Sequence, residues 1–193
     1  MAESANDDTI FWVDPELRGI IPLDGFHVSR SLRKRLNSGV YTFTANKCFN
    51  RIVVCCAQRE TTWINAEIRT LYGQLHEFGY AHSIEVWKGT ELIGGLYGVC
   101  IASAFFGESM FSTDTDGSKL AMLALVARLN AGGFTLLDTQ FLTDHLATMG
   151  GIEISQSKYR DKLTEALDVR ADFWKLSDQS DVRELWQLST QTS

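Results

Sequence analysis

The order of the expected elements predicts an α+β fold with a mixed, mostly antiparallel sheet flanked by helices. Strand patterns follow one another from Ala81 to Met110 with no helix between them, and consecutive strands usually pair as antiparallel neighbours. A helix and a strand then follow up to Phe141, which adds one parallel pair. The helix, from about Ser118 to Asn130, is apolar nearly all round, so we expect it to be buried.

Composition limits the class of protein. The 193 residues, 45% of them apolar, are enough for a sizeable core in one domain with a small appendage. No apolar run approaches the roughly 20 residues that cross a bilayer, and the acidic start from Met1 to Asp8 is unlike a signal peptide. We therefore expect a cytoplasmic protein. The net charge of −6 argues against nucleic-acid binding over the whole surface but permits a local basic patch.

The cysteines and histidines show no metal-ligand spacing. Cys55 and Cys56 are adjacent, and no Cys-x-x-Cys pair occurs among the 4 cysteines. We expect buried free thiols rather than disulfides or zinc ligands, and no metal site.

The N-terminal region looks irregular. Both prolines, Pro15 and Pro22, lie within it and set rigid turns. We expect a small lobe over residues 1–38, followed by the main domain over residues 39–193. Residues 27–36 predict a short helix with Ser29 as its N-cap and an apolar stripe on one side.

Four cations occupy the other faces of that short helix: Arg30, Arg33, Lys34 and Arg35. They form either an ordinary solvated helix face or a local field that attracts phosphate groups.

The middle of the chain predicts regular elements of both kinds. Residues 46–57 and 65–78 have the period of amphipathic helices, and Gly79 ends the second. The expected strands cover residues 41–44, 81–88 and 134–141, and the stretch from Glu91 to Phe111 predicts two more, the second over residues 101–110. A further helix is expected over residues 159–169.

The stretch from Glu91 to Phe111 is crowded with glycine and carries Glu108 among apolar neighbours. Glycine inside a strand marks a bulge or a close approach, and a carboxylate among apolar groups is costly unless it has partners. The stretch is either a core hairpin whose Glu108 faces water or an apolar pocket with one polar anchor.

Asp138 and Gln140 form the best catalytic pair, because alternation places them on the same face of a strand. A carboxylate beside an amide can orient an amine nucleophile and hold its developing ammonium; the alternative is a strand end without chemistry. Ser109 and Ser112 have no histidine nearby in sequence, so serine hydrolase chemistry has weak support, and nothing visible activates Cys55.

Several motifs occur in series between Phe11 and about Leu163. They are His27-Val-Ser-Arg-Ser-Leu-Arg, Thr62-Trp-Ile, Ala81-His-Ser-Ile-Glu-Val-Trp, Glu91-Leu-Ile-Gly-Gly-Leu-Tyr-Gly-Val, Phe106-Gly-Glu-Ser-Met-Phe, Ser118-Lys and Leu137-Asp-Thr-Gln. In content, order and spacing the series resembles the bacterial leucyl/phenylalanyl-tRNA–protein transferases. The resemblance is specific because several independent motifs follow in one order.

The resemblance implies an aminoacyltransferase that moves Leu, Phe or Met from aminoacyl-tRNA to the N-terminal Arg or Lys of acceptor proteins. The product carries a destabilising N-terminus, which the N-degron pathway of protein degradation reads. The resemblance also implies a catalytic domain shaped like a GNAT-type N-acetyltransferase. Separately, we expect the protein to be a monomer. No cofactor is expected, because the ester that joins the amino acid to tRNA is already activated and the enzyme must chiefly position the reactants.

Site roles follow from the same resemblance by matching position. The aminoacyl pocket would involve Trp63, Leu96, Phe105, Glu108, Met110 and Leu125. The aromatic face of Trp63 would suit stacking on the terminal adenosine. Asp138 and Gln140 would serve peptide-bond formation, and the cations at positions 30, 33, 34 and 35 would hold acceptor-stem phosphates.

The chain also departs from the family pattern. Met1 falls about where the family's N-terminal segment ends, so we expect a truncated N-terminal lobe. Thr139 replaces a residue that is often cysteine, and Leu125 is smaller than the aromatic residue of some members. Both changes would alter the size of the pocket.

Two other functions remain open from the sequence. One is an acetyl-CoA-dependent N-acetyltransferase of the same fold, although Asp114 and Asp116 would repel pyrophosphate at the turn that enters the buried helix. The other is a catalytically silent module that binds tRNA or peptide.

Overall fold

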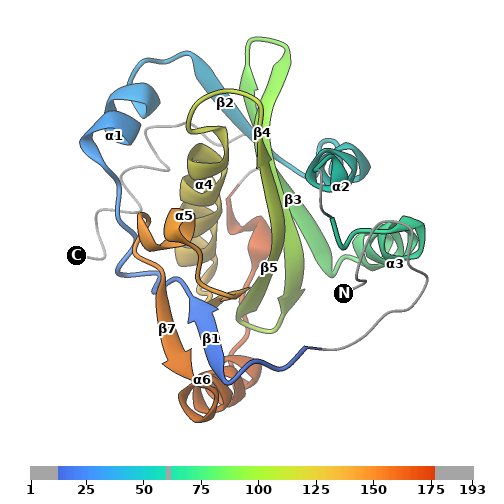
Figure 1. The fold of residues 1–193 in the computed structure, drawn as a ribbon, viewed down its shortest axis with the longest axis vertical. Helices are drawn as coiled ribbons and strands as arrows, with labels where there is room; N and C mark the ends of the chain where they lie inside the picture. The colour runs from blue at the N-terminus through green and yellow to red at the C-terminus, as the bar shows by residue number, and fades with distance from the viewer. Residues whose placement is uncertain (1–12, 60–61, 177–193) are drawn as a thin grey trace.

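A sheet with the strand order β2-β3-β4-β5-β6-β1-β7 runs through the described part of the chain, residues 13–59 and 62–176 of a computed structural model (Figure 1). The elements are β1 (Leu17–Ile20), α1 (Arg30–Leu36), β2 (Tyr41–Ala45), α2 (Phe49–Ala57), α3 (Ala66–Glu77), β3 (Ala81–Lys88), β4 (Glu91–Ile101), β5 (Ala104–Ser112), α4 (Gly117–Gly132), β6 (Leu136–Gln140), α5 (Asp144–Ala147), β7 (Ile152–Ser155), α6 (Gln156–Asp168) and the 3-10 turn η1 (Phe173–Lys175).

The strand directions confirm the predicted fold class. Neighbouring strands in this sheet are antiparallel, except that β5 and β6 are parallel. The parallel pair is the one that the helix between residues 118 and 130 predicts, since a crossover helix joins parallel neighbours.

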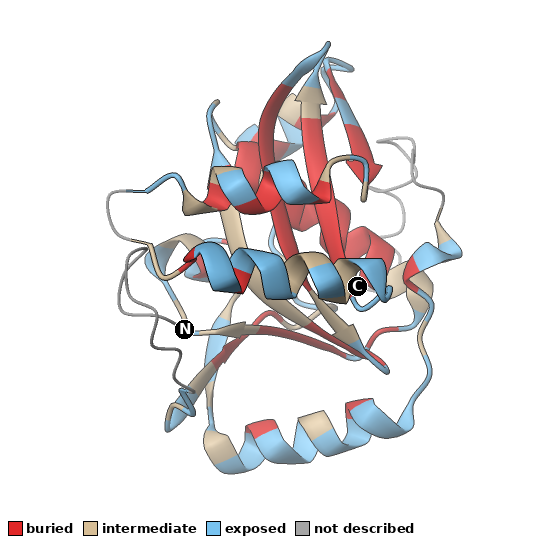
Figure 2. Cartoon of the chain, turned by 90° about the vertical axis from the view of Figure 1, so that its right-hand side faces the viewer, coloured by how far each residue is buried: buried red, intermediate tan, exposed pale blue. Residues whose placement is uncertain are grey.

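Helices cover both faces of the sheet. Alternating side chains of β5 show this, because Phe105 belongs to the core cluster under α4, whereas Ala104 and Phe106 pack with the cluster under α6. Figure 1 places α4 on one face and α2 with α3 on the other. In Figure 2, α2 and α3 lie over strands that are largely buried, and their own outer sides are exposed.

The longest helix confirms the expectation of burial. Every residue of α4 from Gly117 to Leu129 except Lys119 is buried. Such a helix has no polar face to present to water, so its formation depends on the sheet on one side and on α1, α5 and η1 around it.

Local signals placed α1 correctly. The helix begins after Ser29, whose hydroxyl accepts a hydrogen bond from the backbone N–H of Leu32 at 3.2 Å. Leu32 and Leu36 are buried, as the apolar stripe predicts. No signal for α5 or β7 was recognised in the sequence.

The first strand lies inside the sheet. β1 pairs with β6 on one side and with β7 on the other. The expected domain boundary after residue 38 stays a prediction, and the first 12 residues of the expected lobe lie outside the described part. Among the described helices, none has the length and apolar character needed to cross a membrane.

Candidate active site

The sheet opens between β5 and β6. These strands pair only where Ala104–Phe106 lie beside Leu136–Asp138, after which β5 continues to Ser112 while β6 ends at Gln140. A cavity of about 930 Å³ lies at this opening. Its volume is that of a site for a small ligand or the end of a larger one.

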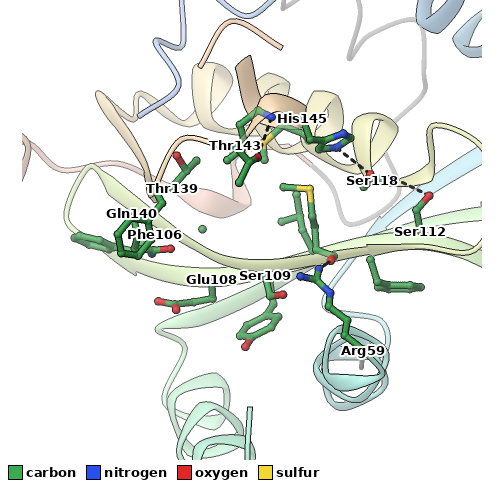
Figure 3. A pocket seen from close by; sticks show the side chains of 18 of the residues that line it. Arg59, Phe106, Glu108, Ser109, Ser112, Ser118, Thr139, Gln140, Thr143 and His145 are labelled. Carbon is green, nitrogen blue, oxygen red and sulfur yellow. Dashed lines mark hydrogen bonds between the residues drawn. The ribbon is translucent and has the colours of Figure 1, made fainter. Parts of the chain in front are cut away.

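The cavity is lined from both faces of the sheet. On the side of α4 the wall is apolar and contains Leu96, Met110, Met122, Leu125 and Leu146. On the side of α2 and α3 the lining is aromatic and includes Trp63, Tyr72, Tyr97 and Phe111. Figure 3 shows polar side chains of β5, β6, α4 and α5 around this space.

Glu108 owes its position to a β-bulge. Tyr97 faces Ser109 and the next residue, Gly98, faces Gly107, so Glu108 is the extra residue of β5. A bulge redirects a side chain from the regular alternation. Glu108 thereby lines the cavity in the neighbourhood of Tyr72 and Asp138.

The environment of Glu108 favours its protonated form. Burial raises the pKa of Glu108 from 4.5 to about 7, and the negative charge of Asp138 adds to the rise. The hydroxyl of Tyr72, which hydrogen-bonds to the carboxylate, opposes it. Glu108 therefore changes charge near neutral pH.

We expect the free energy of unfolding to depend on the protonation of Glu108. Its pKa is higher in the folded state, so the folded protein binds more protons between about pH 4.5 and pH 7. Stability should therefore fall as pH rises through that window and level off above it. Glu108→Gln should remove this dependence and stabilise the protein by about 2 kcal/mol at pH 8.

Chemical denaturation of wild type and variant at several pH values measures this difference. The control is Glu91→Gln, which makes the same change at an exposed position. Wild-type and Glu108→Gln curves that stay parallel from pH 4.5 to pH 8 would contradict the expectation.

Asp138 lies one layer behind the cavity, although Gln140 lines it. The Asp138 side chain is fully buried, and the guanidinium of Arg18 contacts both of its carboxylate oxygens, at 3.0 Å from Nε to Oδ1 and 2.7 Å from Nη2 to Oδ2. Tyr159 donates its hydroxyl to Oδ2 at 2.6 Å. The backbone N–H of Gln140 donates to Oδ1 at 2.8 Å.

A serine–histidine pair lies at the N-terminus of α4. Ser118 Oγ is 3.2 Å from His145 Nε2, and the backbone N–H of Ser118 donates to Ser112 Oγ at 3.3 Å (Figure 3). Burial and the nearby charge of Lys119 lower the pKa of His145, so the imidazole is neutral at pH 7. The pair gives the apolar side of the cavity a polar edge.

Two buried hydroxyls at the cavity lack a hydrogen-bond partner within the described part of the chain. They belong to Tyr97 and Thr139. A buried hydroxyl without a partner is costly, and such groups occur where a water or ligand completes the bonding.

The structure brings most of the predicted site together. Gln140 and five of the expected pocket residues line the cavity, namely Trp63, Leu96, Glu108, Met110 and Leu125. Phe105 does not line it. Its ring is fully buried on the α4 side and stacks at 6.2 Å on Phe173, whereas the adjacent Phe106 reaches the cavity.

The predicted tRNA-binding cations lie on α1, outside the cavity. Arg30, Arg33 and Lys34 are exposed. Arg35 is half-buried, with its Nε 3.0 Å from the carboxylate of Asp116 and its Nη1 donating to the hydroxyl of Tyr41 at 3.2 Å. One face of α1 therefore carries positive charge, and Arg35 also links this helix to the turn before α4.

Sequence reasoning missed the residues that hold Asp138. Arg18 is a lone cation in a four-residue strand, and Tyr159 is one aromatic residue on a polar helix. It also missed Arg59, whose guanidinium donates to the carbonyl of Met110, and the neighbours of Ser118. No local pattern marks these residues, because their partners are distant in the chain.

Within residues 13–59 and 62–176, no group of three or more His, Cys, Asp and Glu side chains is arranged to hold a metal ion. The four cysteines are free thiols, and burial raises the pKa of Cys56 to about 12. A thiol with so high a pKa is a poor nucleophile at neutral pH.

The chain is similar in sequence to known proteins of one family. A family model described as leucyl/phenylalanyl-tRNA protein transferase matches residues 20–164. A leucyl/phenylalanyl-tRNA–protein transferase of Maricaulis maris (strain MCS10) is 54% identical over 197 residues, which cover 100% of this chain and 91% of the relative. One of Ruegeria sp. (strain TM1040) is 57% identical over 173 residues, which cover 90% of this chain and 82% of the relative.

A comparison with solved structures finds RimL, a ribosomal L7/L12 alpha-N-protein acetyltransferase in complex with coenzyme A. The sequences are 18% identical, the TM-score is 0.30, and the match covers 56% of this chain and 68% of RimL.

The family match spans most of the chain, and the relatives are more than half identical over nearly its whole length. The chain therefore belongs to the leucyl/phenylalanyl-tRNA–protein transferase family.

Proposed function

We propose that this protein transfers Leu or Phe, and also Met, from aminoacyl-tRNA to the N-terminal Arg or Lys of acceptor proteins. The new N-terminal residue marks the acceptor for degradation through the N-degron pathway. One observation carries the proposal: an apolar cavity opens beside Gln140 where β5 and β6 separate. Family membership supplies the reaction class.

The apolar side of the cavity suits the donor side chain. Leu96, Met110 and Leu125 offer apolar contacts for a donor side chain that is apolar and unbranched at its Cβ atom. A β-branched side chain is wider next to the backbone, so a narrow entrance disfavours Val and Ile. Leu125 sets part of the pocket's size, and Trp63 can stack on the terminal adenosine of the tRNA.

The other side of the cavity suits the reacting polar groups. Glu108 is the polar anchor and can accept hydrogen bonds from the donor's α-ammonium group. The side-chain amide oxygen of Gln140 can accept one from the acceptor's α-amine. In the reaction the amine nitrogen bonds to the ester carbonyl carbon and loses a proton, and the ester C–O bond breaks. The leaving tRNA oxygen gains a proton, so the tRNA leaves with a free terminal hydroxyl.

The exposed cations of α1 are the proposed contacts for tRNA phosphates. Phosphate contacts supply affinity without reading sequence. The choice of tRNA would then rest mainly on the attached amino acid and on the 3′ end. We place the reaction in the cytoplasm, where aminoacyl-tRNA is made, and expect the enzyme to act as a monomer.

A transfer assay tests the function. The purified full chain is mixed with tRNA carrying labelled Leu or Phe and with a protein that begins with Arg. A matched protein that begins with Ala is the control acceptor. We expect label on the Arg protein alone. Absence of label, or acetylation of the acceptor when acetyl-CoA is supplied instead, would refute the proposal.

Reversal of charge on α1 tests the tRNA contacts. Arg33→Glu combined with Lys34→Glu should weaken aminoacyl-tRNA binding and lower the slope of log affinity against log salt by about 2, which is roughly one unit for each lost phosphate contact. Binding titrations at several salt concentrations measure both effects.

The control for that charge reversal is Lys158→Glu combined with Lys162→Glu. Both lysines are exposed on α6, at the end of the molecule away from α1 (Figure 1). Equal loss of affinity in the two double variants would show that only net charge matters and would remove α1 from the site.

A further inference from the structure

We propose that Arg18 and Tyr159 are positioning residues for the transfer reaction. Through Asp138 they hold the backbone of Gln140 in a turn that points its side chain into the cavity. The inference rests on the proposed function, because Gln140 matters only if transfer takes place beside it. It assigns Asp138 a role through the backbone of Gln140 rather than through contact with a substrate.

Asp138 is unavailable to a substrate. Its side chain is fully buried, and both oxygens accept hydrogen bonds from protein donors. Oδ1 accepts from Arg18 Nε and from the N–H of Gln140, and Oδ2 accepts from Arg18 Nη2 and the hydroxyl of Tyr159. A carboxylate has about four lone-pair sites, so this one is saturated.

Gln140 has an unusual backbone conformation. Its φ is +59°, in the left-handed region that residues other than glycine rarely adopt. The N–H of Phe141 donates to the carbonyl of Thr139 at 2.7 Å, which makes Gln140 the centre of a three-residue turn. Such strain persists only where the surroundings impose it, and it concentrates at functional sites.

Asp138 and β1 impose this turn at Gln140. The contact from the N–H of Gln140 to Asp138 Oδ1 joins a side chain to the backbone two residues later, a local arrangement that stabilises tight turns. Behind the turn, a Cβ on Gly19 would lie 2.5 Å from the carbonyl carbon of Phe141, so glycine is needed for β1 to lie this close.

Two elements that are distant in the chain fix the carboxylate of Asp138. Arg18 comes from β1 and Tyr159 from α6, and the guanidinium carbon lies 4.7 Å from the centre of the tyrosine ring. A forked guanidinium and a hydroxyl together determine the rotation of the carboxylate plane. Loss of either contact loosens Asp138 and weakens its hold on Gln140. The consequence is a lower kcat with little change in donor binding.

Tyr159→Phe tests this directly, because it removes one hydroxyl and keeps the ring. We expect kcat for transfer to fall at least about tenfold, with the KM for aminoacyl-tRNA unchanged. The control, Tyr80→Phe, makes the same change at an exposed site. A lower melting temperature with kcat unchanged at temperatures where the variant is folded would reduce Tyr159 to a structural residue and overturn the proposal.

A second test separates positioning from charge. In Asp138→Asn the new amide would face the donors of Arg18, and we expect transfer to fall at least about a hundredfold. Adding Arg18→Met removes that conflict, and the asparagine oxygen can still accept from the N–H of Gln140. We expect the double variant to transfer at least about tenfold faster than Asp138→Asn alone.

A double variant no faster than Asp138→Asn would show that the carboxylate charge itself is required, which overturns the positioning role. These outcomes are read as ratios to wild-type transfer, so they are separate from the proposed function. If the wild type transfers no amino acid, the proposed function fails first.

Discussion

Asp138→Ala should lower the rate of aminoacyl transfer by at least about 1,000-fold, equivalent to about 4 kcal/mol of transition-state stabilisation. The substitution removes the acceptor for the N–H of Gln140 and releases the strained turn that holds the amide at the cavity. Binding of Leu-tRNA should remain nearly unchanged, because Asp138 does not line the cavity. Single-turnover transfer and a binding titration without acceptor measure the two effects.

The variant should also be less stable than wild type. It leaves the Arg18 guanidinium without its ion-pair partner, and removal of one member of a buried pair costs about 3–5 kcal/mol. Transfer is therefore measured well below the melting temperature of the variant. Asp161→Ala, an exposed site two residues after Tyr159, is the control. Parallel loss of transfer and of donor binding would contradict a local role and indicate a general folding defect.

Gly94→Ala should destabilise the protein by about 3 kcal/mol or more. A Cβ at this position would lie 2.5 Å from the carbonyl carbon and 2.7 Å from the carbonyl oxygen of Gly117. These atoms belong to the backbone at the N-terminus of α4 and cannot move aside as a flexible side chain would. The helix must shift away from β4, and Ser118 shifts with it. Chemical denaturation measures the loss of stability.

A matched glycine serves as control for this prediction. Gly73 lies within α3, where an added Cβ would meet only Asn50 Oδ1 at 3.7 Å. Gly73→Ala should therefore stabilise the protein by about 0.5–1 kcal/mol, since alanine is the better helix former. A Gly94→Ala variant as stable as wild type would contradict this prediction. It would show that the apolar wall of the cavity does not depend on the close packing of β4 against α4.

Local patterns predicted most elements and several parts of the site. Helical periodicity and a serine cap located α1, and apolar character predicted the burial of α4. The motif series placed Trp63, Met110 and Gln140 at one site, and all three line the cavity. The predictions for α1 and α4 depend on the pattern of residues near one another in sequence. The prediction of a shared site depends on the resemblance of the motif series to a family.

Local sequence patterns could not predict three other features of the site. Phe105 and Phe106 are adjacent phenylalanines, and only the packing around the sheet, which buries Phe105 against Phe173, decides which one meets the cavity. The bulge at Glu108 depends on the register between β4 and β5. His145 approaches Ser118 only because α5 packs beside the start of α4, so the sequence separation of 27 residues concealed the pair.

The sequence by itself determined the family, the fold class and the residue types that the chemistry needs, because periodicity and motif spacing are properties of the linear chain. The tertiary structure alone decided how Asp138 is held. Insertion of β1 between β6 and β7 brings Arg18 to a carboxylate 120 residues away, and α6 brings Tyr159 to the same group. The physical reason is that a buried charge requires partners from whichever strands and helices surround it, and chain order does not specify those neighbours.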